Sequence, residues 1–143
     1  MSDLNRTAAY SDIEGGLQAW FKTLPAITAL VAQRIFQGMP RKGPSAYPVI
    51  TLFRVGGGPE EGDYPIDGAH VQIDCWGNPG DKLRTQGVAQ AVISALLSMQ
   101  CGTLLSSNVR GLGVYGINTL YLPDPGTGQS RYSVDCKVQC QAV

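Results

Sequence analysis

Few side chains in this chain of 143 residues could take part in catalysis. His70 is the only histidine, so a serine or cysteine nucleophile would have to use it as its base. It lies on a predicted strand beside Gln72 and Asp74, where a lone histidine is more typical of a surface or an interface. We therefore expect no catalytic residue in this protein.

The patterns for metal and phosphate binding are equally weak. Asp63, Asp67 and Asp74 could be imagined as the metal-binding acids of a nuclease, but their spacing matches no site that we can justify. Gly56–Gly58 precedes an acidic loop and lacks the helix start and the lysine of a phosphate-binding loop. Arg41–Gly43 is a small basic turn, and two charges in a loop are ordinary. We expect no metal ion and no cofactor.

The cysteines are not arranged as a zinc site. Cys75, Cys101, Cys136 and Cys140 contain no C-x-x-C pair, and a zinc site needs closely spaced thiolates or imidazoles. Cys136 and Cys140 lie on one predicted strand, where a rise of roughly 3.3 Å per residue puts them ~13 Å apart, too far for a disulfide. We expect free thiols that pack as small apolar side chains.

Composition excludes several classes of protein. Eleven basic and eleven acidic residues give a net charge of zero, without the basic excess of a nucleic-acid binder. Charged residues make up 15% of the chain, against about a quarter in a typical protein. Protein neighbours covering part of the surface would explain this, and a polar, glycine-rich surface explains it nearly as well. Neither a signal peptide nor a membrane span is predicted, which favours a cytoplasmic, reducing environment.

Helical periodicity occurs in two regions. Ser11–Glu14 has the pattern of a capping box, and an apolar stripe follows it to Leu24. Pro25 begins a second, short helix. Asp81 begins a long helix to about Met99, whose apolar stripe is widened by further apolar residues. The stripe consists of Val88, Val92, Ala95, Leu96 and Met99, widened by Ala89, Ile93 and Leu97.

Strands are predicted where apolar and polar residues alternate. The clearest are 69–76 and 131–140, with further strands at 34–40, 47–55 and 114–122. In 114–122 we expect one face to carry Tyr115, Ile117, Thr119 and Tyr121. We expect the last strand to pair with 70–76 or with 114–122, and its Val134, Cys136 and Val138 to lie under the long helix.

The predicted architecture is α+β: a largely antiparallel sheet of about 4–5 strands with two helices packed on one face. Residues 1–10 show no periodicity and are predicted to form a flexible N-terminal arm. Residues 11–143 are predicted to form a single domain, since this length suits one core.

Element order and short motifs resemble one known family. The motifs are LPAITALV at 24–31, RIFQGMP at 34–40, YPVI at 47–50 and VQIDCW at 71–76. Together they are similar to the tail-completion, or tail-terminator, proteins of long-tailed bacteriophages. The resemblance implies an open sheet carrying two helices. It also implies a structural virion protein, without enzymatic activity, that forms a ring on the tail tube.

The resemblance also implies partners and a location. A homo-oligomeric, hexameric ring would end polymerisation of the major tail tube protein and join the tail to the head–tail connector or stopper protein. DNA would pass through the ring lumen without sequence-specific binding, and no membrane would be involved. The protein would lie in the tail or neck of the virion after assembly in the host cytoplasm.

Three alternatives remain open from the sequence. One is another neck or head-closure component of the same particle. The second is a small carboxylate-metal nuclease, which would require acids converging at a pocket. The third is a host binding module with an α+β fold, which a stable ring would disfavour.

A predicted loop at Gly56–Asp67 is the candidate contact with an adjacent subunit or the tail tube. About twelve residues is long for a hairpin, where two to five are usual, and the segment holds four acids and no base. We expect it to be mobile in the free subunit and ordered on assembly. The candidate contact residues are Gly58, Pro59, Glu60, Glu61, Asp63, Tyr64, Ile66 and Asp67.

Overall fold

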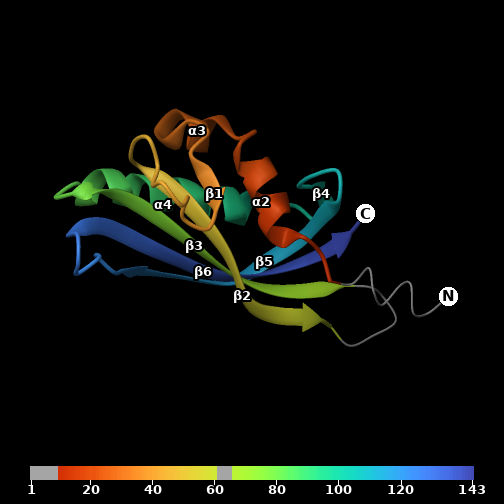
Figure 1. Cartoon of the computed structure of the whole chain (residues 1–143). Helices are drawn as coiled ribbons and strands as arrows, with labels where there is room; N and C mark the ends of the chain where they lie inside the picture. Colours follow the sequence, from red (N-terminus) through yellow and green to blue (C-terminus); the bar gives the residue numbers. More distant parts are fainter. Residues whose placement is uncertain (1–9, 61–65) are drawn as a thin grey trace.

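The computed structural model describes residues 10–60 and 66–143, and in these it has three helices and six strands. The helices lie together over one face of the sheet (Figure 1). In chain order the elements are α2 (Ile13–Phe21), α3 (Pro25–Val31), β1 (Ile35–Gln37), β2 (Val49–Pro59), β3 (Asp67–Pro79), α4 (Lys82–Ser98), β4 (Thr103–Leu104), β5 (Val109–Tyr121) and β6 (Gln129–Ala142). No helix in these ranges is long and apolar enough to cross a membrane.

The strand order in the sheet is β1-β2-β3-β6-β5-β4. β1 pairs with β2 in parallel, and every other pair is antiparallel. The last strand, β6, lies between β3 and β5, so both predicted pairings are confirmed. The prediction of 4–5 strands missed the short outer strand β4, and the parallel pairing of β1 makes the sheet mixed.

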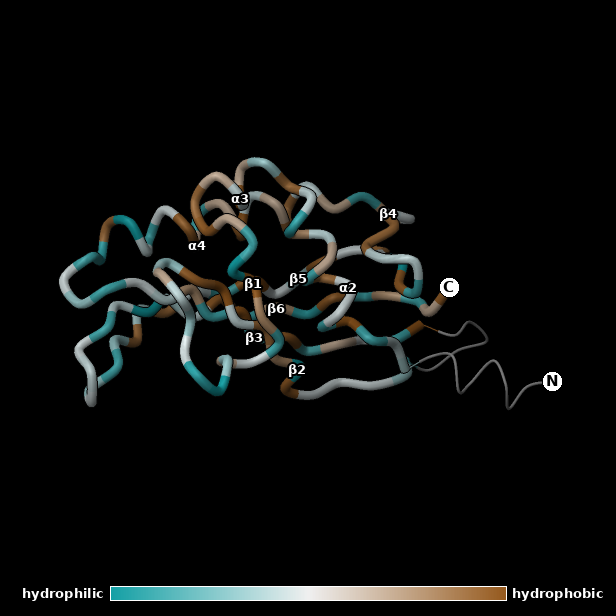
Figure 2. The backbone as a smooth tube through the Cα atoms, turned by 45° about the horizontal axis from the view of Figure 1, so that its top comes forward, coloured by the Kyte–Doolittle hydropathy of each residue, from teal (hydrophilic) through white to brown (hydrophobic). Residues whose placement is uncertain are grey.

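The core lies between the sheet and the helices. Val134 and Val138 of β6 are fully buried and Cys136 nearly so, in one apolar cluster with α4, as predicted. The stripe of α4 is narrower than expected, because Leu97 is 70% exposed. Figure 2 shows apolar segments along the helices and strands, and mainly hydrophilic loops at the end opposite the chain termini.

Helix α2 starts differently from the prediction. Asp12, and not Ser11, is its N-cap: the Gly15 amide donates to Asp12 Oδ1 at 3.1 Å. Ser11 is instead bonded to the sheet. Gly16 allows a close approach, since a Cβ there would lie 3.1 Å from the Cβ of Val109 in β5. The glycines that weaken the isolated helix therefore serve its cap and its packing.

The predicted face of β5 is wrong, because the strand is bulged. Tyr115 pairs with Lys137, whereas Tyr121 pairs with Tyr132, and the register shifts between Tyr115 and Asn118. Directly opposed residues share a face of the sheet. Tyr115 therefore lies on the face without helices, and Tyr121 lies on the other face with its ring 4.9 Å from that of Tyr132.

Both ends of the predicted loop at Gly56–Asp67 are strand: β2 continues to Pro59, and β3 begins at Asp67. Gly58 pairs with Gly68 and Pro59 with Asp67, and the Glu60 amide donates to the Ile66 carbonyl at 2.8 Å. Three glycines argue against a strand by propensity, but antiparallel pairing with β3 overrides that preference. Residues 61–65, at the tip of this hairpin, lie outside the described residues.

Candidate interaction surfaces

A buried ion pair fixes the base of the β2–β3 hairpin. Arg54 Nη1 and Nη2 each lie 2.6 Å from an oxygen of the Asp67 carboxylate. Burial by itself would raise the pKa of Asp67, but the bonds from Arg54 and Ser11 outweigh it and hold that pKa below its ordinary value. The bond to Asp67 likewise raises the pKa of Arg54. Both side chains are therefore charged across the whole physiological range.

The N-terminal part of the described chain is tied to this pair. The Ser11 amide and hydroxyl donate to Asp67 Oδ2 at 2.9 and 3.0 Å. The Tyr10 ring lies 4.0 Å from the Arg54 guanidinium carbon, and Ser11 also contacts the Cys140 thiol at 3.0 Å. α2, β2, β3 and β6 are thus joined at one point, beside the hairpin.

The structure separates the candidate contact residues into groups. Gly58 and Pro59 belong to β2, and Glu60 and Ile66 close the ladder. Asp67 is fully buried inside the subunit. The remaining candidates, which lie outside the described residues, are Glu61, Asp63 and Tyr64.

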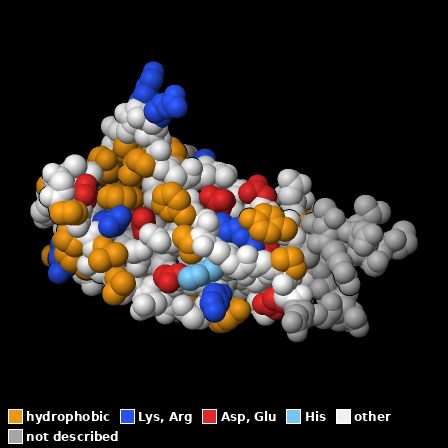
Figure 3. All heavy atoms as spheres, turned by 60° about the horizontal axis from the view of Figure 1, so that its bottom comes forward, with side chains coloured by type: hydrophobic (Ala, Val, Ile, Leu, Met, Phe, Trp, Pro, Cys, Tyr) orange, Lys and Arg blue, Asp and Glu red, His pale blue; other side chains and the backbone are white. Residues whose placement is uncertain are grey.

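Polar side chains cross the face of the sheet that the helices leave open (Figure 3). His70 Nε2 lies 2.5 Å from Asp135 Oδ1, which joins β3 to β6. Trp76 donates to Thr51 Oγ1 at 3.1 Å, with the Arg131 guanidinium over its ring. These bonds engage the histidine and the aromatic ring within the sheet.

Glu60 takes part in the same polar face. Its two carboxylate oxygens accept from Gln139 Nε2 at 3.3 and 3.2 Å, so the end of β2 is linked across β3 to β6. This bond fixes the first residue of the acidic segment. Sequence patterns predicted neither this link nor the Arg54–Asp67 pair, although an arginine at an inward position of β2 was a usable signal.

The exposed apolar side chains of this face lie on β2 and β5. Phe53 and Val55 of β2 are 36% and 51% exposed, and Tyr115 and Leu120 of β5 are 46% and 55% exposed. The central strands β3 and β6 carry no large exposed apolar side chain. Exposed apolar surface therefore lies at the two sides of the sheet and not at its centre.

The described residues contain no cluster of three potential metal ligands. Asp67 is held by Arg54, while Asp74 is bonded to Gln72 and lies 3.9 Å from Arg131. Every buried side-chain nitrogen or oxygen in the described part has a hydrogen-bond partner. The two aspartates thus serve separate structural contacts, while Asp63 lies outside the described residues.

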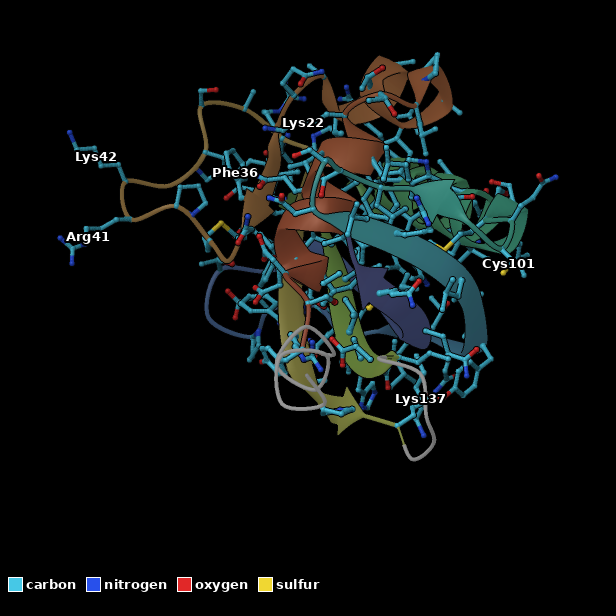
Figure 4. The ribbon with its side chains drawn as sticks, turned by 90° about the vertical axis from the view of Figure 1, so that its right-hand side faces the viewer. Lys22, Phe36, Arg41, Lys42, Cys101 and Lys137 are labelled. Atoms are coloured by element: carbon cyan, nitrogen blue, oxygen red, sulfur yellow. The ribbon has the colours of Figure 1, made fainter. Side chains whose placement is uncertain are left out.

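Two further features stand at the sides of the molecule. Arg41 and Lys42 lie at the tip of a loop that projects away from the body, and Cys101 lies on the opposite side (Figure 4). Cys101 is exposed, whereas Cys75, Cys136 and Cys140 are buried, and all four are free thiols.

A family model that matches most of its length places this chain in the class of structural proteins associated with the tail of a virion. More narrowly, the chain belongs to the family of tail completion protein gp17, whose model matches residues 15–139. That match extends from the first turns of α2 almost to the end of β6.

A solved structure has the same fold. A chain in the virion of a native gene transfer agent particle superposes with a TM-score of 0.63 at 19% sequence identity. The superposition covers 91% of this chain and 98% of that chain. Comparison with curated proteins gives no match.

Proposed function

We propose that this protein forms a closed ring that caps the tail tube, ends its polymerisation and joins the tail to the head connector. The observation that carries the proposal is the family match over residues 15–139, which includes the core elements of the fold. A hexamer is the state that the family resemblance implies. In this function the protein needs no chemistry of its own.

The difference between the two faces of the sheet supports such a role. Helices cover one face, while the other face carries no helix in the described residues and has polar side chains between apolar ones on β2 and β5. A protein that stops a polymer must bind the last subunit on one surface and present a different surface beyond it. Cyclic symmetry turns these unlike surfaces of one chain into the unlike surfaces of a ring. The balanced charge of the chain suits a lumen that lets DNA pass without holding it.

The acidic segment between β2 and β3 is the proposed contact with a neighbouring subunit or the tube. Its base is rigid, since Arg54 and Asp67 hold both strands and Glu60 is bonded to Gln139. Asp67 acts in this proposal as an anchor, while Gly58, Pro59, Glu60, Glu61, Asp63, Tyr64 and Ile66 are the proposed contacts.

The test is complementation of a phage that lacks this gene. Without the protein, lysates should contain free heads and separate tail tubes of irregular length, and the wild-type chain should restore joined particles. In the informative variant, an Asn-Gly turn replaces residues 61–65, because Glu60 and Ile66 already pair. It should fold but fail to join heads to tails.

A matched control separates charge from length. Glu61→Gln with Asp63→Asn keeps the length of the segment and removes two charges. If only the shortened chain fails to join heads to tails, the contact requires the length of the segment. If both variants fail, the contact requires its charge. Joined particles of normal length in the absence of the protein would refute the ring-cap function itself.

A further inference from the structure

The long strands β2 and β5 each pair with a short outer strand over only part of their length. β1 pairs with Ile50–Leu52 of β2, and β4 pairs with Arg110–Gly111 of β5. In the described residues no strand lies beside the rest of either strand. We name these uncovered parts the β2 edge (Phe53–Pro59) and the β5 edge (Gly113–Tyr121). Their backbone groups offer a template for pairing with another strand.

The two edges lie on opposite sides of the sheet and overlap in level from Phe53 to Gly58, while the strands that flank them, β1 and β4, lie at diagonally opposite corners. Through the central strands, Ile50 is level with Tyr121, and Pro59 is level with Gly111. β1 therefore covers one end of its side of the sheet, and β4 covers the other end of the opposite side. Three antiparallel pairings separate β2 from β5, so the two strands run in opposite directions. Copies placed side by side in the same orientation would bring β5 and β2 together as antiparallel neighbours.

Neither edge carries the charges that usually protect an exposed strand. The β5 edge contains no charged residue. The β2 edge contains one, Arg54, whose side chain is 6% exposed and is paired with Asp67 inside the subunit. The usual electrostatic barrier to strand pairing is therefore missing on both sides.

Apart from Leu104 of β4, the large apolar side chains exposed on the described strands belong to these same edges. Val55 is the most exposed large apolar residue of the β2 edge, and Leu120 is the most exposed of the β5 edge. Phe53 and Tyr115 extend the two apolar strips. Burial of such side chains between copies would add a hydrophobic contribution to the backbone hydrogen bonds.

We infer that the β5 edge of one copy pairs antiparallel with the β2 edge of the next copy, so that the sheet continues from subunit to subunit. The inference rests on the proposed ring and names the surfaces that build it. The joint is heterologous, because each copy offers a different edge to each neighbour. Such a joint closes into a ring when its rotation allows.

The short outer strands set the offset of the joint. β1 occupies the level of Ile50–Leu52, and opposed residues must share a face, so an incoming β5 ends with Tyr121 opposite Arg54 and Leu120 opposite Val55. Because Tyr121 is level with Ile50 within one copy, the neighbour is shifted along the strands by about four residues, or ~13 Å. A stagger of this kind is what a closed sheet with tilted strands requires.

Cysteine cross-linking of the full-length chain tests the joint. Val55→Cys and Leu120→Cys are combined in a Cys101→Ser background, which removes the exposed native thiol. Both positions are more than half exposed, so the fold should tolerate the changes. Assembly is first measured by mass photometry, on the purified chain and on particles, and mild oxidation is then read on a denaturing gel. We expect a ladder of covalent multimers up to the size of the ring.

The single-cysteine chains are the controls, and should give no ladder. A dimer formed by Leu120→Cys alone would mean symmetric β5–β5 pairing and would overturn the inference. A chain that assembles without any cross-link would also overturn it, while leaving the ring proposal intact. A chain that is monomeric in solution and in particles would refute the ring, and the joint with it.

Discussion

Arg54 and Asp67 form a two-pronged ion pair across the first hairpin, with both guanidinium nitrogens 2.6 Å from carboxylate oxygens. The side chains are 6% and 0% exposed. Bonds from Ser11 complete the shell around the carboxylate. This pair joins the start of the described chain to the centre of the sheet, and its removal should be costly.

Arg54→Ala should lower the free energy of unfolding by about 3–5 kcal/mol, because it leaves a buried carboxylate without its partner. Arg54→Lys keeps the charge but loses the two-pronged bond, so its loss of unfolding free energy should lie between zero and that of Arg54→Ala. Urea denaturation is the measurement. The control is Arg84→Ala, whose exposed pair with Asp81 spans 4.0 Å and should contribute less than about 1 kcal/mol. Equal losses for Arg54→Ala and Arg84→Ala would contradict the prediction.

Acid should destabilise the protein through Asp67. Its folded-state pKa lies below the value of about 3.9 for an unfolded chain, so its contribution is complete above that pH and is lost as pH falls through the folded-state pKa. Asp67→Asn cannot titrate, and its stability should fall less steeply below pH about 4. Thermal unfolding between pH about 5 and about 2 measures the slopes. Identical slopes for wild type and variant would assign the acid sensitivity elsewhere.

Gly77→Ala should destabilise the contact between β3 and α4. A Cβ at this position would lie 2.0 Å from Thr85 Oγ1 and 2.7 Å from Ser130 Oγ, two buried hydroxyls that are bonded to each other. We expect a loss of about 1–3 kcal/mol from this overpacking. Gly87→Ala is the matched control in open space on α4, and should gain up to about 1 kcal/mol. A neutral Gly77→Ala would show that the hydroxyls can move aside.

Thiol chemistry should distinguish one cysteine from three. Burial raises the pKa of Cys75 far above its ordinary value, and that of Cys140 to about 11. Burial, with the charge of Asp135, raises the pKa of Cys136 to about 12. At pH about 8 a disulfide reagent should therefore modify only Cys101 rapidly, and the other three after unfolding. Rapid reaction of a Cys101→Ser chain would contradict this assignment.

The long, regular elements could be predicted because their periods are visible. Strict alternation defined β3 and β6, and the stripe of α4 predicted a helix from Lys82 to Ser98 within one residue at each end. β1, with three residues, lies within the strand expected at 34–40, whereas β4, with two residues, is too short to show a period. They form because a longer strand is already in place beside them.

The features that were predicted wrongly depend on contacts between residues that are far apart in the sequence. The bulge between Tyr115 and Asn118 is set by pairing with β6, and it reverses the face of every residue after it. Ser11 does not cap α2 as predicted, because its hydroxyl donates to the buried carboxylate of Asp67. Asp12 is the N-cap instead. Arg54 and Asp67 are thirteen positions apart, and only the hairpin register brings them together.

The anchorage of Ser11 to Asp67 has a mechanical consequence. Tension applied to the chain before Ser11 would reach β3 directly, through charge-reinforced hydrogen bonds, before it reached α2. The load would be shared by the interstrand ladders on both sides of β3, and the few turns of α2 would be shielded from it. A pull on the chain before Ser11 would thus be resisted by the ladders of the sheet rather than by the helix.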